Sequence, residues 1–168
     1  VNVKDFGALG DGITDDTQAI TEAIAKHKNV YFPTGWYRVT ETIKLNKGTK
    51  LMGMHPYATQ LVLNEGETNF SGFGAPVPVL ESSKGGDDII NGIGINTGAY
   101  NNRAVALKWM ANKSSMINDV KIVGGHGNMS KPGQPSHNHK RNQKISSPTK
   151  PVYERGMDQT WDTQYWTI

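Results

Sequence analysis

The stretch from Val3 to Ile20, VKDFGALGDGITDDTQAI, decides which fold the sequence predicts. Residues Val1 to Phe6 alternate apolar and polar side chains and predict a short strand, which nearby glycines then interrupt. Asp15 followed by Gln18 has the spacing of a capping box, and the apolar residues that follow lie on one helical face. We therefore expect a single α-helix within about residues 15–28.

After this helix the sequence predicts only short strands, each bounded by Gly, Pro, Asn or Asp. The expected strands are Val30–Phe32, Tyr37–Thr40, Thr42–Leu45, Lys50–Gly53, Gln60–Leu63, Val77–Glu81, Ile89–Ile95, Ala104–Trp109 and Met116–Val123. An Asn-Gly pair occurs once, at Asn91 inside an apolar run, so a meander of hairpins is disfavoured.

Many short strands behind one leading helix predict an all-β fold, a parallel β-solenoid. In such a fold the strands of successive coils stack about 4.8 Å apart, and inward-facing apolar residues form ladders. The helix would cover the first coil, because the end of a solenoid exposes unpaired backbone. A β-sandwich is the alternative that the same strand lengths permit.

Composition and charge exclude several classes of protein. The chain of 168 residues suits one domain, and its lack of cysteine excludes a disulfide framework, thiol catalysis and Cys-ligated zinc. No apolar run approaches the length of a membrane span. The chain starts at Val1 without an apolar leader, which favours a processed or excised piece of a longer protein.

The positive charge is confined to one segment, Met129–Val152, which holds five basic residues, four prolines and no acid. Without these five charges the net charge of +3 becomes 3 − 5 = −2. The segment predicts an exposed insertion between two coils rather than a nucleic-acid surface. A binding arm for an anionic partner is the alternative.

The N-terminal residues resemble the signature of the pectate-lyase-like superfamily. The matching segments are Val3–Ala8, Gly10–Gly12, Thr14–Ile20, Val30–Pro33, Gly35–Tyr37 and Leu51–Gly53. The resemblance covers about residues 1–65 and implies a right-handed parallel β-helix. Members include polygalacturonase-like hydrolases, laminarinase-type β-1,3-glucanases, alginate epimerases and phage tailspikes, so the fold alone does not name the reaction.

These observations divide one β-helix domain, residues 1–168, into four parts. Residues 1–29 form the N-terminal strand and capping helix, and residues 30–128 form the coils. Residues 129–152 form the basic insertion, and residues 153–168 begin a further coil. Because the chain stops within an aromatic run, we expect it to be the N-terminal part of a longer β-helix.

The segment Val123–Asn128, VGGHGN, resembles the histidine motif of polygalacturonases, where the histidine lies beside the catalytic acids. The resemblance makes His126 a substrate-binding or orienting group. Asp119 is the nearest acid, and either Asp119 or Asp158 would serve as general acid or base. The sequence lacks the family's Asn-Thr-Asp and Arg-Ile-Lys motifs, and a glycine-rich turn with a surface histidine is the alternative.

The last residues could form a carbohydrate surface, because aromatic faces stack on sugars and polar side chains bind hydroxyls. The candidate residues are Trp161, Asp162, Tyr165 and Trp166. The alternative is that they are core residues of the next coil.

The sequence has two pairs of adjacent acids. Asp15-Asp16 is expected to have a structural role, and Asp87-Asp88 is expected to form a turn rather than a calcium site or a catalytic pair of acids. We expect no metal or cofactor.

The sequence thus predicts a secreted, periplasmic or cell-surface protein that acts on a polysaccharide, with glycoside hydrolysis as the first choice. A non-enzymatic glycan-binding tailspike or adhesin segment is the alternative, and a tailspike would be trimeric. A polysaccharide lyase is the second alternative. An epimerase ranks lower, because the sequence has no Tyr-Gly-Phe-Asp-Pro-His-type stretch.

Overall fold

The computed structural model describes residues 1–98 and 101–124, which are mostly β with one α-helix. The elements in chain order are η1 (Val3–Phe6), β1 (Asp11–Asp15), α1 (Thr17–Lys26), β2 (Asn29–Phe32), β3 (Gly35–Arg38), β4 (Ile43–Lys44), β5 (Lys50–Gly53), β6 (Thr59–Val62), η2 (Thr68–Phe70), β7 (Val77–Glu81), β8 (Ile89–Asn91), β9 (Gly94–Asn96), β10 (Ala104–Lys108), β11 (Met116–Asn118) and β12 (Lys121–Val123). In this part of the chain no helix has the length and apolarity needed to cross a bilayer.

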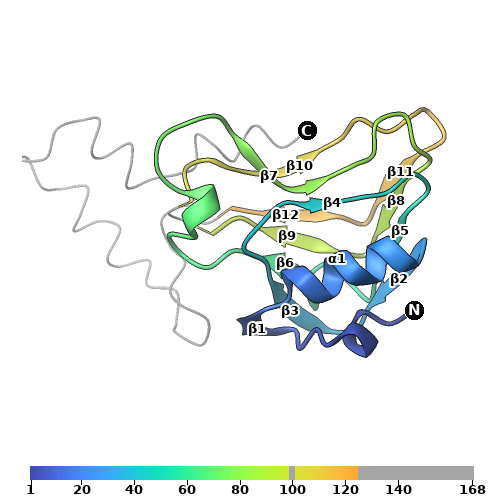
Figure 1. Ribbon diagram of the computed structural model, residues 1–168, viewed down its shortest axis with the longest axis horizontal. Helices are drawn as coiled ribbons and strands as arrows, with labels where there is room; N and C mark the ends of the chain where they lie inside the picture. The colour runs from blue at the N-terminus through green and yellow to red at the C-terminus, as the bar shows by residue number, and fades with distance from the viewer. Residues whose placement is uncertain (99–100, 125–168) are drawn as a thin grey trace, which may run out of the picture.

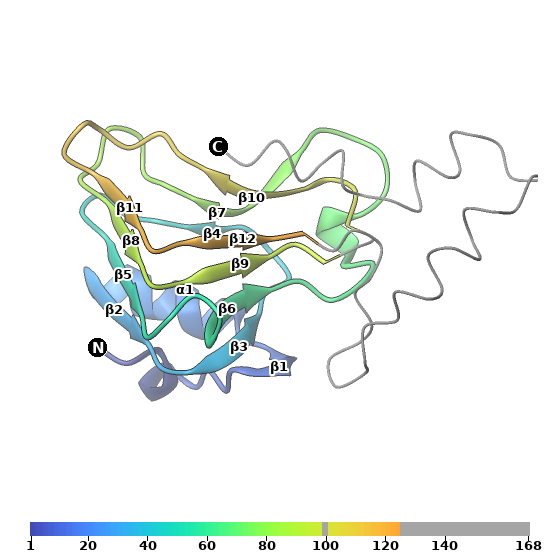
Figure 2. The same ribbon diagram turned by 180° about the vertical axis from the view of Figure 1, so that it is seen from behind.

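The chain passes through three parallel sheets in a repeating order. Sheet A contains β2, β5, β8 and β11; sheet B contains β1, β3, β6, β9 and β12; sheet C contains β4, β7 and β10. From β2 onward, strands three apart in the chain are hydrogen-bonded neighbours, which Figures 1 and 2 show as strands stacked one above another. One pass through sheets A, B and C is called a coil below. The described strands pair in parallel and do not form an antiparallel sandwich.

Apolar side chains stack in register at one inward-facing position of each sheet. The stacked residues are Val30, Leu51 and Ile90 in sheet A, Tyr37, Leu61 and Ile95 in sheet B, and Ile43, Leu80 and Leu107 in sheet C. All nine are at most 1% exposed. Burial of these branched and aromatic side chains, at roughly 25 cal/mol per Å² of apolar surface, holds each coil on its neighbour.

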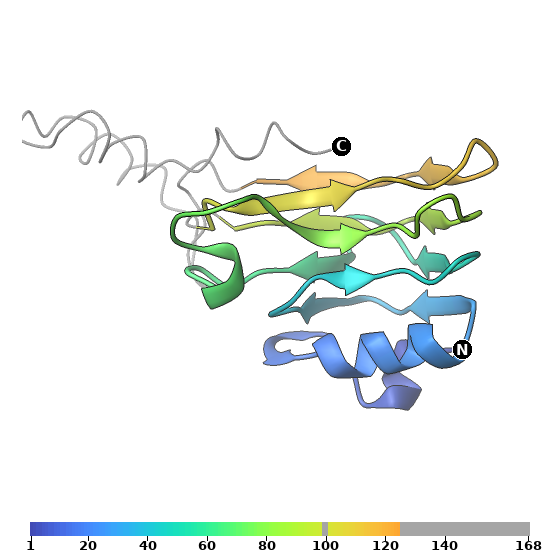
Figure 3. The same ribbon diagram turned by 45° about the horizontal axis from the view of Figure 1, so that its top comes forward.

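Helix α1 covers the end of the stack that carries β1 and β2, as Figure 3 shows. Its buried residues are Ile20, Ala23 and Ile24, and the helix packs against η1, β2 and β4. The predicted helix is therefore present within the expected range.

The predicted start of this helix is wrong. The residue before the first turn is Asp16, whose side chain makes no capping bond, whereas the carboxylate of Asp15 accepts the Thr17 amide at 3.0 Å. Gln18 does not reach back, because its amide donates to Glu22 at 3.0 Å. The predicted capping box between Asp15 and Gln18 is therefore absent.

The predicted strand over Val1–Phe6 is also wrong, because local capping competes with strand pairing there. Residues Val3–Phe6 form a 3-10 turn in which the Asn2 side chain accepts the Lys4 amide at 2.9 Å. Gly7 ends the turn with a φ of 96°. Only Asn2 pairs as a strand residue, in an isolated parallel bridge to Tyr31.

Two predicted strands are each divided by a corner. The run Ile89–Ile95 contains β8 and β9, and the run Met116–Val123 contains β11 and β12. The corners contain Gly92 and Asp119, with φ values of 69° and 48°, which let the chain turn from sheet A into sheet B.

Replacing Thr97 by valine is expected to stabilise the protein by about 1 kcal/mol. Thr97 directly follows β9 and occupies the position that Val39 and Leu63 occupy after β3 and β6. The backbone amide of each of these three residues donates to the carbonyl of the last strand residue in the next coil. Thr97 is 3% exposed, and its hydroxyl has no hydrogen-bond partner in the described structure. Urea unfolding measures the change.

Thr49→Val is the matched control for this prediction. Thr49 is 0% exposed and its hydroxyl donates to the Asn46 carbonyl at 2.7 Å, so valine there should destabilise by about 1 kcal/mol. Destabilisation by both substitutions would contradict the assignment of an unsatisfied hydroxyl to Thr97.

Candidate functional site

Asp119, the predicted catalytic carboxylate nearest to the Gly-His-Gly motif, lies at an exposed corner between β11 and β12. Asn118 pairs in register with Asn91 and donates to its side-chain oxygen at 2.5 Å, so Asp119 aligns with Gly92 of the preceding coil. Asp and Asn are enriched among non-glycine residues with positive φ, which explains an acid at this corner. Its exposure also leaves the side chain accessible to a ligand.

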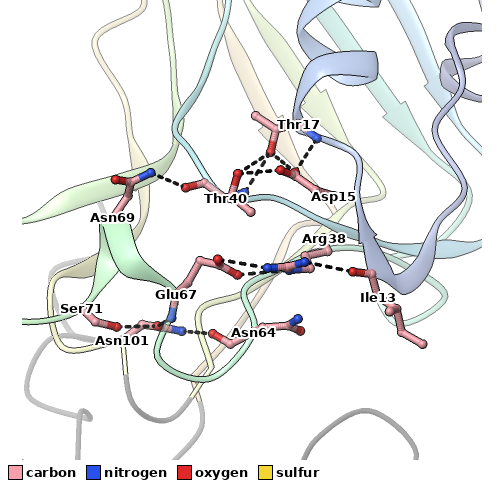
Figure 4. Close-up of polar contacts among 10 residues, drawn as sticks. All are labelled: Ile13, Asp15, Thr17, Arg38, Thr40, Asn64, Glu67, Asn69, Ser71 and Asn101. Atoms are coloured by element: carbon pink, nitrogen blue, oxygen red, sulfur yellow. Dashed lines mark hydrogen bonds and ion pairs between the residues drawn. The ribbon is translucent and has the colours of Figure 1, made fainter.

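A second polar feature lies at the other end of the sheet B strands, where the chain leaves them. Gly124, which follows β12, is separated from Asp119 by about 16 Å of extended chain. At this edge the chain turns from sheet B toward sheet C, and polar side chains from several coils gather (Figure 4). We call this group the polar ridge; it consists of Asp15, Thr17, Arg38, Thr40, Asn64, Glu67, Asn69, Ser71 and Asn101.

An ion pair between Arg38 and Glu67 forms the centre of the polar ridge. The guanidinium donates to both carboxylate oxygens at 3.1 Å and, through its third nitrogen, to the Ile13 carbonyl at 3.0 Å. The two side chains are 25% and 10% exposed. This bidentate pair fixes the connection between β6 and β7 against β1 and β3.

Asn101 joins two coils with its side-chain amide. The nitrogen donates to the carbonyls of Asn64 and Thr97 at 2.8 and 2.9 Å. The oxygen accepts the Glu67 amide at 2.8 Å and the Ser71 hydroxyl at 3.0 Å. Because Asn101 is 2% exposed and uses both polar atoms, it holds the ridge in place rather than binding a ligand.

Asp15 joins the ridge through two threonine hydroxyls. Its carboxylate accepts from Thr17 and, at 2.8 Å, from Thr40, whose carbonyl accepts from Asn69 at 2.8 Å. Partial burial raises the pKa of Asp15, but the hydrogen bonds from Thr17 and Thr40 and the charge of Arg38 outweigh it and lower the pKa below its usual value. Asp15 is therefore ionised at neutral pH and suits an acceptor of hydroxyl groups rather than a general acid.

Burial disfavours the charged form of Asp16 and raises its pKa, which is the direction of shift expected for a general acid. It is 1% exposed, however, and its two oxygens accept the amides of Leu9 and Gly10 at 2.7 and 3.0 Å. A substrate cannot reach this carboxyl. The pair Asp15-Asp16 thus fixes the N-terminal turns, as the sequence predicted.

The second acid pair, Asp87-Asp88, also has structural partners. Asp88 is 0% exposed and accepts from the Gly48 amide at 3.0 Å and from the amide and hydroxyl of Ser83 at 2.7 Å. Asp87 is exposed and accepts from Asn112 at 2.6 Å. Among residues 1–98 and 101–124, no three His, Asp or Glu side chains are arranged to hold a metal ion.

The remaining predicted site residues lie outside the described residues. They are His126, Asp158, Trp161, Asp162, Tyr165 and Trp166. The basic segment 129–152 and the predicted further coil 153–168 lie outside them as well. Of the predicted catalytic set, the structure therefore places Asp119 alone.

The sequence interpretation missed the polar ridge. Arg38 and Glu67 are 29 residues apart, and no local motif links them. Only the register of β3 on β6, which aligns Arg38 with Val62, brings the connection after β6 beside the arginine.

The comparisons with known proteins agree with this architecture. A family model described as "Rhamnogalacturonase A/epimerase, pectate lyase-like" matches residues 1–147. The chain is 33% identical over 91 residues to a glucan 1,3-beta-glucosidase of Cochliobolus carbonum, covering 52% of this chain and 11% of that protein. The chain thus spans about a tenth of the length of this curated relative.

Two solved structures are similar over most of the chain. The mannuronan C-5 epimerase AlgE4 A-module of Azotobacter vinelandii is 26% identical with a TM-score of 0.54, covering 72% of this chain and 37% of that chain. ORF18 of Geobacillus virus E2 is 33% identical with a TM-score of 0.52, covering 64% of this chain and 22% of that chain.

Proposed function

The chain belongs to the rhamnogalacturonase A/epimerase, pectate lyase-like family, and from this premise we propose that it serves a secreted or surface-exposed protein that hydrolyses a polysaccharide. The scaffold in this proposal is a right-handed parallel β-solenoid whose first coil is capped by α1. The observation that carries the reaction is the 33% identity to a relative named as a glucan 1,3-beta-glucosidase. The partner is a polysaccharide or oligosaccharide, and the mechanism requires no cofactor.

Hydrolysis of a glycosidic bond needs one carboxyl group that protonates the leaving oxygen and a second that activates water or attacks the sugar. Asp119 is the candidate in the described residues, because it is the exposed acid nearest in sequence to the Gly-His-Gly motif. Asp158 is the second candidate carboxyl, with His126 as an orienting group. Trp161, Asp162, Tyr165 and Trp166 are the proposed sugar-binding residues.

Two other functions have specific support. The similarity to a mannuronan C-5 epimerase favours chemistry on uronic acids, either lyase or epimerase. The similarity to ORF18 of Geobacillus virus E2 favours a phage protein. In this alternative the protein binds glycans without turning them over, as a trimer in the tailspike case. Incubation of the natural full-length protein with neutral and uronic polysaccharides separates these functions. Hydrolysis releases new reducing ends without unsaturated sugars, a lyase produces unsaturated sugars, and an epimerase changes the sugar without cleaving the chain.

Asp119→Asn is expected to lower turnover roughly a hundredfold or more, because it removes the carboxylate that transfers the proton. Asparagine tolerates the positive φ of this corner, so the thermal midpoint should stay unchanged. Asp119→Gly should lose the same activity in an equally stable protein, because glycine occupies the aligned corner at residue 92.

Glu41→Gln is the control for charge removal, since Glu41 is an exposed acid in another connection. Turnover of the Asp119→Asn protein equal to that of Glu41→Gln would show that Asp119 is a corner residue and not a catalytic one.

A further inference from the structure

One column of residues crosses sheet B in register on the side opposite the core. It consists of Asp11, Trp36, Gln60, Gly94 and Lys121. Trp36 is 40% exposed, whereas its neighbour Tyr37 is fully buried in the core. Figure 2 shows the strands that carry this column, β1, β3, β6, β9 and β12, one above another.

A short loop, residues 55–58, lies against this column and brings Tyr57 to it. The side-chain nitrogen of Gln60 donates to the carbonyls of Pro56 and Tyr57 at 3.2 and 3.4 Å, and Gln60 is 6% exposed. A Cβ atom at Gly94 would come within 2.2 Å of the Pro56 carbonyl oxygen. The absence of a side chain at Gly94 therefore lets the loop lie directly on β9, and Gln60 fixes it there.

The loop and the strands together present two aromatic rings and a cation. Tyr57 is 61% exposed, and the ammonium of Lys121 lies 3.6 Å from the centre of its ring. The imidazole of His55 stacks beside the same ring, with centroids 5.6 Å apart. In the described residues Lys121 forms no ion pair with a carboxylate, and its ammonium contacts the Tyr57 ring instead.

The spacing of these groups follows from the strand separation of about 4.8 Å. Trp36 lies two strand steps from Gly94, on which the Tyr57 loop rests, and three steps from Lys121. The strand of Trp36 is therefore about 10 Å from the strand on which the Tyr57 loop rests and about 14 Å from the strand of Lys121. Lys121 lies two residues beyond Asp119, so the row leads to the Asp119 corner.

We propose that Trp36, Tyr57 and Lys121 form a binding platform on which an extended polysaccharide chain lies along the stack toward Asp119. The exposed ring of Trp36 stacks on the apolar face of a sugar ring, and the Lys121 ammonium, held against the Tyr57 ring, binds a sugar hydroxyl or carboxylate. A loop fixed by Gln60 and Gly94 is ordered before the ligand binds, which lowers the cost of binding. The inference rests on the proposed function, because it names the surface that receives the polysaccharide.

Binding of a soluble β-1,3-glucan and of polymannuronate to the natural full-length protein tests the platform. Trp36→Ala and Tyr57→Ala should each weaken binding of the preferred polymer at least tenfold, and Trp36→Phe should retain most of it. Phe73→Ala is the control, since Phe73 is 85% exposed and belongs to the connection between β6 and β7. Thermal midpoints equal to that of the parent show that the variants fold.

Lys121→Gln distinguishes the two kinds of polymer. A loss confined to polymannuronate means that the ammonium pairs with a sugar carboxylate and assigns the platform to an acidic chain, whereas an equal loss with both polymers means that it binds a hydroxyl that both chains carry. Unchanged affinity in both Trp36→Ala and Tyr57→Ala overturns the platform while leaving the proposed function intact. If the parent protein neither binds nor converts any polysaccharide, the proposed function itself fails.

Discussion

Replacing Asp88 by alanine is expected to lower the free energy of unfolding by about 4 kcal/mol. Its buried carboxylate accepts three hydrogen bonds, from the Gly48 amide and from the amide and hydroxyl of Ser83. The Asp88 amide itself donates to the Ser115 hydroxyl at 3.1 Å. One residue thus joins the connections from sheet C to sheet A in three successive coils, and alanine would leave three donors without an acceptor.

Asp87→Ala is the matched control for this prediction. Asp87 is the neighbouring acid, exposed, with one hydrogen bond to the Asn112 side chain at 2.6 Å, so its loss should cost about 1 kcal/mol or less. Chemical denaturation of both variants gives the comparison. Equal losses of stability would show that Asp88 does not hold the coils together.

Ile20→Asp is expected to destabilise the protein by roughly 3 kcal/mol or more, because it places an unpaired charge beneath α1. Ile20 is 0% exposed and belongs to the core that the helix shares with η1, β2 and β4. The substitution tests whether α1 is a cap that the stack needs or a helix that merely lies beside it.

Thr21→Asp is the control for the helix, since Thr21 is the next residue and is exposed. It introduces the same side chain into the same turn without burying it, so stability should change by less than about 1 kcal/mol. A thermal midpoint that falls equally for both variants, or for neither, would contradict the capping role.

The sequence predicted most strands because their ends carry residues that interrupt pairing. The expected bounds of Lys50–Gly53 and Val77–Glu81 agree with β5 and β7. The corners at Gly92 and Asp119 were not predicted, because each is a single residue within an apolar run. A glycine or aspartate in such a run can mark a corner, but the residue type alone does not fix its φ.

The site was less predictable than the fold, because its groups meet only through the register of the sheets. The Arg38–Glu67 pair and the Trp36–Lys121 row join residues that are far apart in the chain. Asp119 was identified from its closeness in sequence to Gly-His-Gly, but not as a residue aligned with Gly92. The predictions for His126, Asp158 and the aromatic residues from Trp161 to Trp166 remain predictions.

Hydrolysis of a polysaccharide by the natural full-length protein can be tested by analysing the products of the reaction. Neutral glucans and polyuronates are incubated with the protein, and reducing ends, unsaturated sugars and binding are measured on each polymer. We expect new reducing ends without unsaturated sugars on at least one polymer, and a loss of this activity in Asp119→Asn. Unsaturated products would contradict hydrolysis in favour of a lyase, and tight binding by a stable trimer without any product would contradict it in favour of a glycan-binding tailspike.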